Sequence, residues 1–263
     1  MREIFGLAAP KAATKRKKTP GVVHVAVFKN EAPRKKGPDF GGEAIMARLR
    51  GQEKVAADWV KDLSPKTISF YDVVVVPNMY LRHTNLGPHW ESSVRQFVLA
   101  GGSALLIHHS AGFRATATPA FPEVATVGDF IAAQGMRVVA DHPVVNAAAV
   151  AKAFPAKVND PAFASEITRY KLAVGDTFHS GFPDYMQLAP GKAGTVVVRS
   201  RRLGNLGGDP TVVVGTAGRG RVVLCGMNLG ARSRKVAGKT VTQEFISPQE
   251  ESILVNSIFW LAQ

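Results

Sequence analysis

Four consecutive valines, Val73–Val76, are the feature of this sequence that most restricts its fold. A strand with one face in water alternates apolar and polar residues, whereas an unbroken apolar run is typical of a strand covered on both faces, as in parallel sheets. Similar short runs occur at 22–28 and 103–108, and the segments between them, 41–52 and 87–102, carry apolar residues at helical spacing. We therefore predict a parallel core of alternating strands and helices, in which the valine strand and 103–108 are neighbours.

The second half of the chain has a different pattern. Valine-rich segments at 194–200, 210–216 and 220–228 predict strands, and the glycine-containing turn "AGRG" joins the last two as a hairpin. We expect these antiparallel strands to extend or flank the parallel core. A final helix is expected to begin at Pro248, with Ser247 as its N-cap.

The net charge of +13 comes from two segments. Residues 1–38 hold ten Lys or Arg and two Glu, and residues 199–239 hold nine Lys or Arg and one Asp, so the remainder is slightly acidic. We expect residues 1–20 to be a basic flexible tail and residues 21–263 to be a single domain. The tail is either a solubilising arm, a polyanion contact or a localisation signal, and 232–239 is either a solvated loop or a phosphate clamp.

Cysteine content and hydropathy indicate where such a chain works. The single cysteine, Cys225, excludes an internal disulfide framework and suits a reducing compartment. No apolar run approaches the roughly 20 residues that a membrane span needs, and the N-terminus lacks the apolar region of a secretion signal. We expect a cytoplasmic protein without membrane contact.

Several segments, taken in order, resemble a known superfamily. These are "YDVVVVPN", "ALLIHHSAGF", "DHPVV", "GDPTVVVGTAGRGRVVLCGMN" and "SPQEESILVNSIFWLA". Over roughly residues 20–263 the chain resembles the class I glutamine amidotransferase-like superfamily, and within it the ThuA-like, trehalose-utilisation branch. The resemblance implies an α/β fold: a flavodoxin-like three-layer sandwich with a mainly parallel central sheet and added antiparallel strands in the C-terminal half.

The resemblance also bears on glutaminase chemistry. In the amidotransferases of this superfamily, the strand that corresponds to 103–107 ends in a turn that presents a cysteine nucleophile, and His108 stands at about that position here. An imidazole cannot form the thioester of the amidotransferase reaction, so we do not expect glutaminase activity. Cys225 lies inside a valine-rich segment and is expected to be a small core residue.

Polar residues gather where strands are predicted to end, which is where open α/β folds bind ligands. We predict catalytic roles for His108, His109, His179 and Asp184, and ligand binding by Asn78, Ser110, Arg114 and His142. Some of these residues have a plainer structural alternative. Ser110 could make a capping hydrogen bond, and one of the two adjacent histidines could bond to a backbone carbonyl. His142 could fix its own turn through a bond between its side chain and the backbone.

The candidate residues leave three classes of function open. The first is the binding or processing of a carbohydrate-related small molecule in a cleft lined by histidines; the second is a non-catalytic ligand-binding or protein-interaction module; the third is polyanion or nucleic-acid binding through the tail. No cofactor is predicted, and the absence of HxH or HExxH spacing gives no metal site.

Two further expectations concern the segment 108–114. We expect it to form the floor of the principal pocket, with His142 or His179 across the cleft. If the ring of His108 faces that cleft, replacing it with alanine costs little stability.

Overall fold

The computed structural model describes residues 17–30, 41–79, 86, 90–112, 117–132, 135–201 and 207–263. Its central sheet has nine strands in the order β2-β1-β3-β4-β11-β10-β9-β6-β7. Their bounds are β1 Val23–Phe28, β2 Val55–Val60, β3 Val73–Val76, β4 Ser103–Ile107, β6 Gly135–Val138, β7 Thr177–His179, β9 Gly194–Ser200, β10 Pro210–Ala217 and β11 Gly220–Cys225.

The sheet has a parallel half and an antiparallel half. Strands β2, β1, β3, β4 and β11 run parallel to one another, whereas β10, β9, β6 and β7 add antiparallel pairs. The predicted neighbours β3 and β4 pair directly, from Val73 opposite Ser103 to Val76 opposite Leu106. The hairpin predicted through "AGRG" joins β10 and β11. The predicted α/β class with added antiparallel strands is confirmed.

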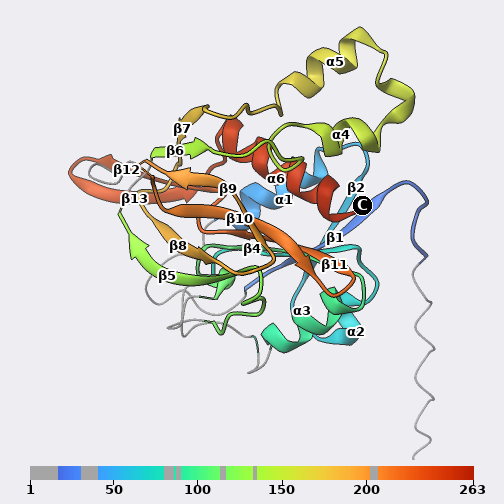
Figure 1. Cartoon of the computed structure of the whole chain (residues 1–263), viewed down its shortest axis with the longest axis horizontal. Coiled ribbons are helices and arrows are strands. Elements are labelled where there is room, and N and C mark those ends of the chain that lie inside the picture. The colour runs from blue at the N-terminus through green and yellow to red at the C-terminus, as the bar shows by residue number, and fades with distance from the viewer. Residues whose placement is uncertain are drawn as a thin grey trace, which may run out of the picture.

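The two faces of the sheet explain the run of valines. Val73 and Val75 belong to one core with helices α1 (Gly42–Arg50) and α6 (Pro248–Leu261), whereas Val74 and Val76 belong to a second core with α2 (Pro65–Ile68) and α3 (Trp90–Leu99). In Figure 1 the sheet lies between α1, α4 (Ala148–Ala153) and α6 on one side and α2 and α3 on the other. Since both faces are covered, successive residues of β3 are all apolar.

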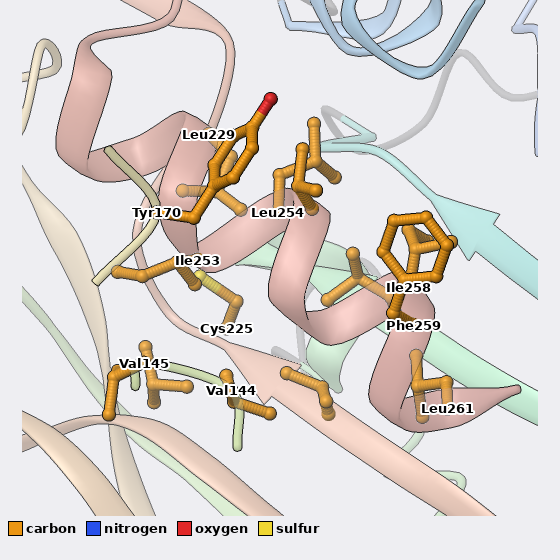
Figure 2. Packing of buried hydrophobic residues seen from close by; sticks show 14 of the residues in the cluster. Val144, Val145, Tyr170, Cys225, Leu229, Ile253, Leu254, Ile258, Phe259 and Leu261 are labelled. Atoms are coloured by element: carbon orange, nitrogen blue, oxygen red, sulfur yellow. The ribbon is translucent and has the colours of Figure 1, made fainter. Parts of the chain in front are cut away.

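Helix α6 starts as predicted and is buried almost throughout. Ser247 accepts a hydrogen bond from the backbone N–H of Glu250, and the carboxylate of Glu250 accepts one from the N–H of Ser247, which completes a capping box after which Pro248 begins the helix. Figure 2 shows Ile253 of this helix beside Cys225 of β11, and Leu254 and Ile258 belong to the same buried cluster. Cys225 is therefore a core residue, as predicted.

Several elements were not predicted. Strands β5 (Ala125–Ile131) and β8 (Tyr185–Pro190) form a separate two-stranded sheet, and β12 (Ala231–Val236) and β13 (Lys239–Glu244) form another. Segment 232–239, expected as a loop, is thus part of a β-hairpin. Helix α5 (Pro161–Thr168) follows α4 above the sheet in Figure 1. No helix in the described ranges is long and apolar enough to cross a bilayer.

Candidate functional site

The site lies at the carboxyl end of β4. The strand ends at Ile107, and a 3₁₀ turn follows from His108 to Ala111. Three contacts of Ser110 tie this turn to the sheet, because its Oγ accepts the N–H of Ile107 at 2.8 Å and lies 2.8 Å from the carbonyl oxygens of both Ile107 and Val76. Ser110 therefore has the hydrogen-bonding position that was the plainer alternative to a ligand contact.

The backbone of His108 is in the left-handed region, with φ of 56°. This conformation is costly for a residue with a Cβ, and such residues persist where the surrounding structure holds them. The turn at Ser110 and the contacts of the His108 ring supply that constraint here. This left-handed conformation turns the chain sharply at the end of β4 and directs the His108 imidazole toward Asn78, at the end of the neighbouring strand β3.

The His108 ring bridges two polar side chains. Its Nδ1 lies 3.2 Å from Oδ1 of Asn78, just past β3, and its Nε2 lies 3.3 Å from Oδ1 of Asp184, just before β8. Tyr185 forms a β-bridge with Met227, which places Asp184 at the carboxyl end of β11. The structure thus brings together three of the predicted residues, Asn78, His108 and Asp184, from three segments far apart in the sequence.

The hydrogen bonds of His108 restrict which of its ring nitrogens can carry a proton. Nε2–H can donate to the Asp184 carboxylate in either charge state of the ring. In the imidazolium, Nδ1–H also donates to the Asn78 oxygen, whereas in the neutral ring Nδ1 needs a donor, which a rotated Asn78 amide supplies. Because both ring nitrogens are engaged and only 2% of His108 is exposed, a ligand meets Asp184, whose side chain is 14% exposed, before it meets His108.

Burial determines the titration of the two histidines. It lowers the pKa of His108, an effect that the hydrogen bond and the negative charge of Asp184 partly offset. His109 is also buried, and its ring centroid lies 4.5 Å from that of His108. Burial, and then repulsion from His108, lowers the pKa of His109 to about 3. His109 is therefore neutral at ordinary pH.

Two phenylalanines flank the histidines, and neither was predicted. The ring centroids of Phe130, in β5, and Phe182 lie 6.3 and 6.2 Å from that of His108. Phe130 is 45% exposed despite its size. Phe182 could have been found from the sequence, because it lies in "HSGFPDY" between two predicted site residues, His179 and Asp184. Phe130 had no comparable signal, because only the pairing of β5 with β8 brings it to the site.

Glu250 is a third residue near the site that was not predicted from the sequence. Its Oε1 accepts hydrogen bonds of 3.0 Å from Ser180 Oγ and from the N–H of Gly181, while Oε2 accepts the N–H of Ser247. The side chain is fully buried, and burial raises the pKa of its carboxyl group, against the effect of these hydrogen bonds. Glu250 thus attaches the start of the segment that carries Phe182 and Asp184 to the N-terminus of α6.

The remaining predicted residues lie elsewhere. His142 packs edge-on against Trp260, with ring centroids 4.9 Å apart, and Nδ1 accepts the N–H of Val144, so it fixes its own turn. Arg221 influences its pKa, which places His142 near the amino end of β11, opposite to His108. His179 is exposed on edge strand β7. Arg114 lies outside the described residues.

The expectation about the principal pocket is corrected. The larger cavity found among the described residues, about 650 Å³, lies at the amino ends of the parallel strands and is lined by Asp72, Ser103, Arg219 and Arg221 among others. At the carboxyl ends, a cavity of about 50 Å³ reaches Asn78 and is bordered by Trp59, Lys29 and Glu244. This volume holds water but not a sugar ring. A larger ligand therefore has to bind over the rim.

A metal site does not emerge from the part of the chain that the structure describes. Within it, no three His, Cys, Asp or Glu side chains converge in a way that could hold an ion. The groups that do meet, His108, Asp184 and Asn78, bind one another.

Comparison with known proteins gives a likeness of fold. The chain matches no protein-family model and no curated protein. A cytoplasmic protein from Salmonella typhimurium superposes with a TM-score of 0.56 at 18% identity, over 91% of this chain and 99% of that one. A ThuA-like protein from Bacteroides uniformis superposes with a TM-score of 0.55 at 14% identity, over 94% of each chain. This chain has a ThuA-like fold.

The same fold also occurs as part of larger proteins. A β-galactosidase from Rahnella sp. R3 superposes with a TM-score of 0.53 at 12% identity, over 89% of this chain but only 30% of the galactosidase. This chain therefore spans about a third of that enzyme. At such identities the likeness concerns architecture, and the function has to be argued from the site.

Proposed function

We propose that this chain binds a carbohydrate-related small molecule over the His108–Asp184 pair and polarises one of its hydroxyl groups there. The observation that carries the proposal is the arrangement of Asp184, a partly exposed carboxylate, against a buried imidazole at the carboxyl ends of β4 and β11. Ligands of open α/β folds bind at these strand ends.

Asp184 is the group that we assign to the ligand. One of its oxygens faces His108 Nε2, which leaves Oδ2 for a ligand hydroxyl. A carboxylate accepts a hydrogen bond from a sugar O–H, and this bond is stronger than one between neutral groups. His108 acts as the positioning residue behind it, because its Nε2–H fixes the orientation of the carboxylate.

Aromatic rings near the pair suit the apolar face of a sugar. Phe130 and Phe182 flank His108, and Trp59 borders the small cavity that reaches Asn78. Ligand sites typically combine such apolar surface with a few polar groups that set orientation. Lys29 at the cavity rim adds a donor.

The same geometry disfavours two reactions. Glycoside hydrolysis normally uses two carboxylates on either side of the bond, and within the described residues Asp184 is the acid that hydrogen-bonds to His108. Glutamine hydrolysis needs an accessible thiolate, whereas Cys225 is buried in β11 and burial raises the pKa of its thiol. We therefore favour binding with hydroxyl polarisation. A non-catalytic interaction module remains the competing proposal.

The test is a saccharide titration followed at the histidine rings. With isotope-labelled histidine, a panel of neutral mono- and disaccharides is added, and the NMR signals of His108 are recorded. At least one sugar should shift them saturably, with little dependence on salt because the ligand is uncharged.

Matched variants decide which end of the sheet responds. Asp184→Asn should weaken that binding at least tenfold, because it replaces a charged acceptor, whereas Asp141→Asn beside His142 should leave it unchanged. If no saccharide in the panel moves the His108 signals, or if both variants respond equally, the carbohydrate proposal is wrong and the interaction module takes its place.

A further inference from the structure

The β12–β13 hairpin is anchored at its base and otherwise stands away from the central sheet. Its two strands pair only with each other within the described sheets, and Figure 1 shows the hairpin extending at the left of the molecule. At the base, the N–H of Phe245 donates to Gly230 and the N–H of Ser233 donates to Gly181. The Glu244 carboxylate accepts the N–H groups of Gly41 and Ala44 at the start of α1.

The hairpin carries four cations and one acid. Arg232, Arg234, Lys235 and Lys239 are all on it, and all are exposed apart from their backbone pairing. The acid, Glu244, is already engaged by the helix. Among the residues that the structure describes, no acidic side chain forms an ion pair with Arg234, Lys235 or Lys239. The outer part of the hairpin therefore presents positive charge that the described part of the fold does not neutralise.

The cations occupy both faces of the ribbon. Successive side chains of a strand point to opposite faces, so Arg232 and Arg234 share one face and Lys235 lies on the other. Lys239, opposite Val236, belongs to the arginine face. Arg232 is held near the base, with its guanidinium 4.9 Å from the centre of the Phe245 ring.

We propose that this hairpin is an arm that binds double-stranded DNA, entering the major groove and contacting phosphates without reading sequence. The major groove, about 12 Å wide, admits a two-stranded ribbon and has a row of phosphates on each side. Arg232, Arg234 and Lys239 lie on one face and Lys235 on the other, so a duplex with phosphates on both sides of the ribbon can contact all four cations, whereas a flat anionic membrane meets at most three. Ser233, Thr240 and Thr242 add hydroxyl groups of the kind that bond to phosphate oxygens.

The composition of the ribbon favours a duplex over a single strand. Proteins that bind single strands without sequence preference stack the bases on aromatic side chains. Residues 231–244 contain no aromatic side chain. The ribbon therefore lacks the groups that would hold unpaired bases, and its interaction with DNA is with the backbone.

The arm lies away from the first described residues of the chain. In Figure 1 the start of the described chain lies at the right, away from the hairpin at the left, and Lys18 pairs with Asp72 at 2.5 Å. Lys17 and Lys18, at the start of the described chain, therefore lie away from the hairpin. The proposal rests on the hairpin alone, and it is independent of the saccharide site.

The experiment measures affinity for a fluorescein-labelled duplex of 20 base pairs at several salt concentrations. Each phosphate contact contributes about 0.9 to the slope of log K against log salt, so four contacts predict a slope near −3.6. The variant Arg234→Gln/Lys235→Gln/Lys239→Gln keeps Arg232 on Phe245 and should reduce the slope by about 2.7. The triple variant Lys66→Gln/Lys171→Gln/Lys192→Gln removes the same charge elsewhere and should keep the wild-type slope.

Each alternative outcome overturns the proposal. A wild-type slope near zero, or equal losses in the two triple variants, shows that the hairpin is not a specific contact. Equal binding of a single-stranded oligonucleotide, or tighter hairpin-dependent binding to phosphatidylserine vesicles at the same salt, assigns the arm to another partner. Circular dichroism checks folding, and if the hairpin triple variant does not fold, Lys239→Gln alone should reduce the slope by about 0.9.

Discussion

The two ends of the parallel strands differ in what their polar groups are doing. At the amino ends there is a cavity of about 650 Å³, and its charged side chains are matched: Arg219 donates to the carbonyl of Ala100, Arg221 donates to that of Trp260, and Lys18 pairs with Asp72. The carbonyls of Ala100 and Trp260 lie at the ends of α3 and α6. These arginines therefore satisfy helix C-termini, a stabilising role that needs no ligand.

At the carboxyl ends the cavity is small, about 50 Å³, but the backbone of one of the polar residues beside it, His108, is strained. His108 has a left-handed backbone and a ring with a lowered pKa, and its buried ring meets Asn78 and Asp184. Strained backbone and buried titratable groups are found preferentially at functional sites. We therefore place the candidate site beside the smaller cavity, where the arrangement of residues is costly, and not in the larger cavity.

The largest effect is expected from replacing His108, which measures how much its buried ring and strained backbone contribute to stability. His108→Ala should lower the free energy of unfolding by about 2 to 4 kcal/mol, because it leaves a void and removes the partner of the buried Asn78 and of the partly exposed Asp184. This replaces the expectation of a small cost, which assumed a cleft-facing ring. His108→Gly should be about 1 kcal/mol more stable than His108→Ala, because glycine tolerates the left-handed backbone.

Urea unfolding of the two variants measures both values. Equal stabilities would show that the backbone at position 108 carries no strain. A cost below 1 kcal/mol for the alanine variant would show that the ring is not buried among partners, and the contrast between the two strand ends would then fail.

The parallel core could be predicted from the sequence because its signals are local. The valines of β3 indicate a strand covered on both faces. The start of α6 is indicated within four residues, by Ser247, Pro248 and Glu250. The turn at His108 was also within reach, since polar residues follow the apolar strand directly. The fold and one end of the site thus followed from short stretches of chain.

The assembly of the site could not be predicted in the same way. Asp184 reaches His108 because Glu250 holds Ser180 and Gly181, a contact across about 70 residues. His142 was assigned to the wrong strand end, since a motif that follows the parallel strands in sequence does not reveal which end its turn returns to. Segment 232–239 was expected as a loop because the strands of the hairpin are polar and pair only with each other.

A second prediction compares the response of the two ends to acid. The pKa of His109 is about 3 in the folded protein, below the value near 6.5 of an unfolded chain, so only the unfolded state gains a proton between these values. This contribution to stability is complete above about pH 6.5 and is lost as pH falls, by about 1.4 kcal/mol per pH unit. Between pH 6.5 and 5 the loss is about 2 kcal/mol.

His109→Gln should remove this part of the acid sensitivity. His142→Gln at the amino ends is the matched control: burial, then Arg221, lowers the pKa of His142 as well, but Asp141 opposes the shift and the ring is only half buried, so its contribution is smaller. Urea unfolding at pH 7 and pH 5 gives the comparison. If His109→Gln loses as much stability on acidification as the unaltered protein, His109 does not account for the acid response of the carboxyl ends.

The smallest effect is expected from Arg221→Met at the amino ends. The change removes the hydrogen bond to the carbonyl of Trp260 and a cation–π contact of 5.2 Å with the same residue, while the methionine keeps much of the apolar stem. These contacts are partly exposed, so unfolding should become easier by about 1 kcal/mol.

Two further measurements show whether Arg221 acts only at the amino ends or also affects the site at the carboxyl ends. The pKa of His142 should rise, because the positive charge that lowers it is gone. The saccharide-induced shifts of the His108 signals should keep their midpoint, because β4 and β11 separate the two ends by five to six residues, about 16 to 20 Å. A shifted midpoint would show that the amino ends act on the site through the strands, and the two ends would then have to be treated as one functional unit.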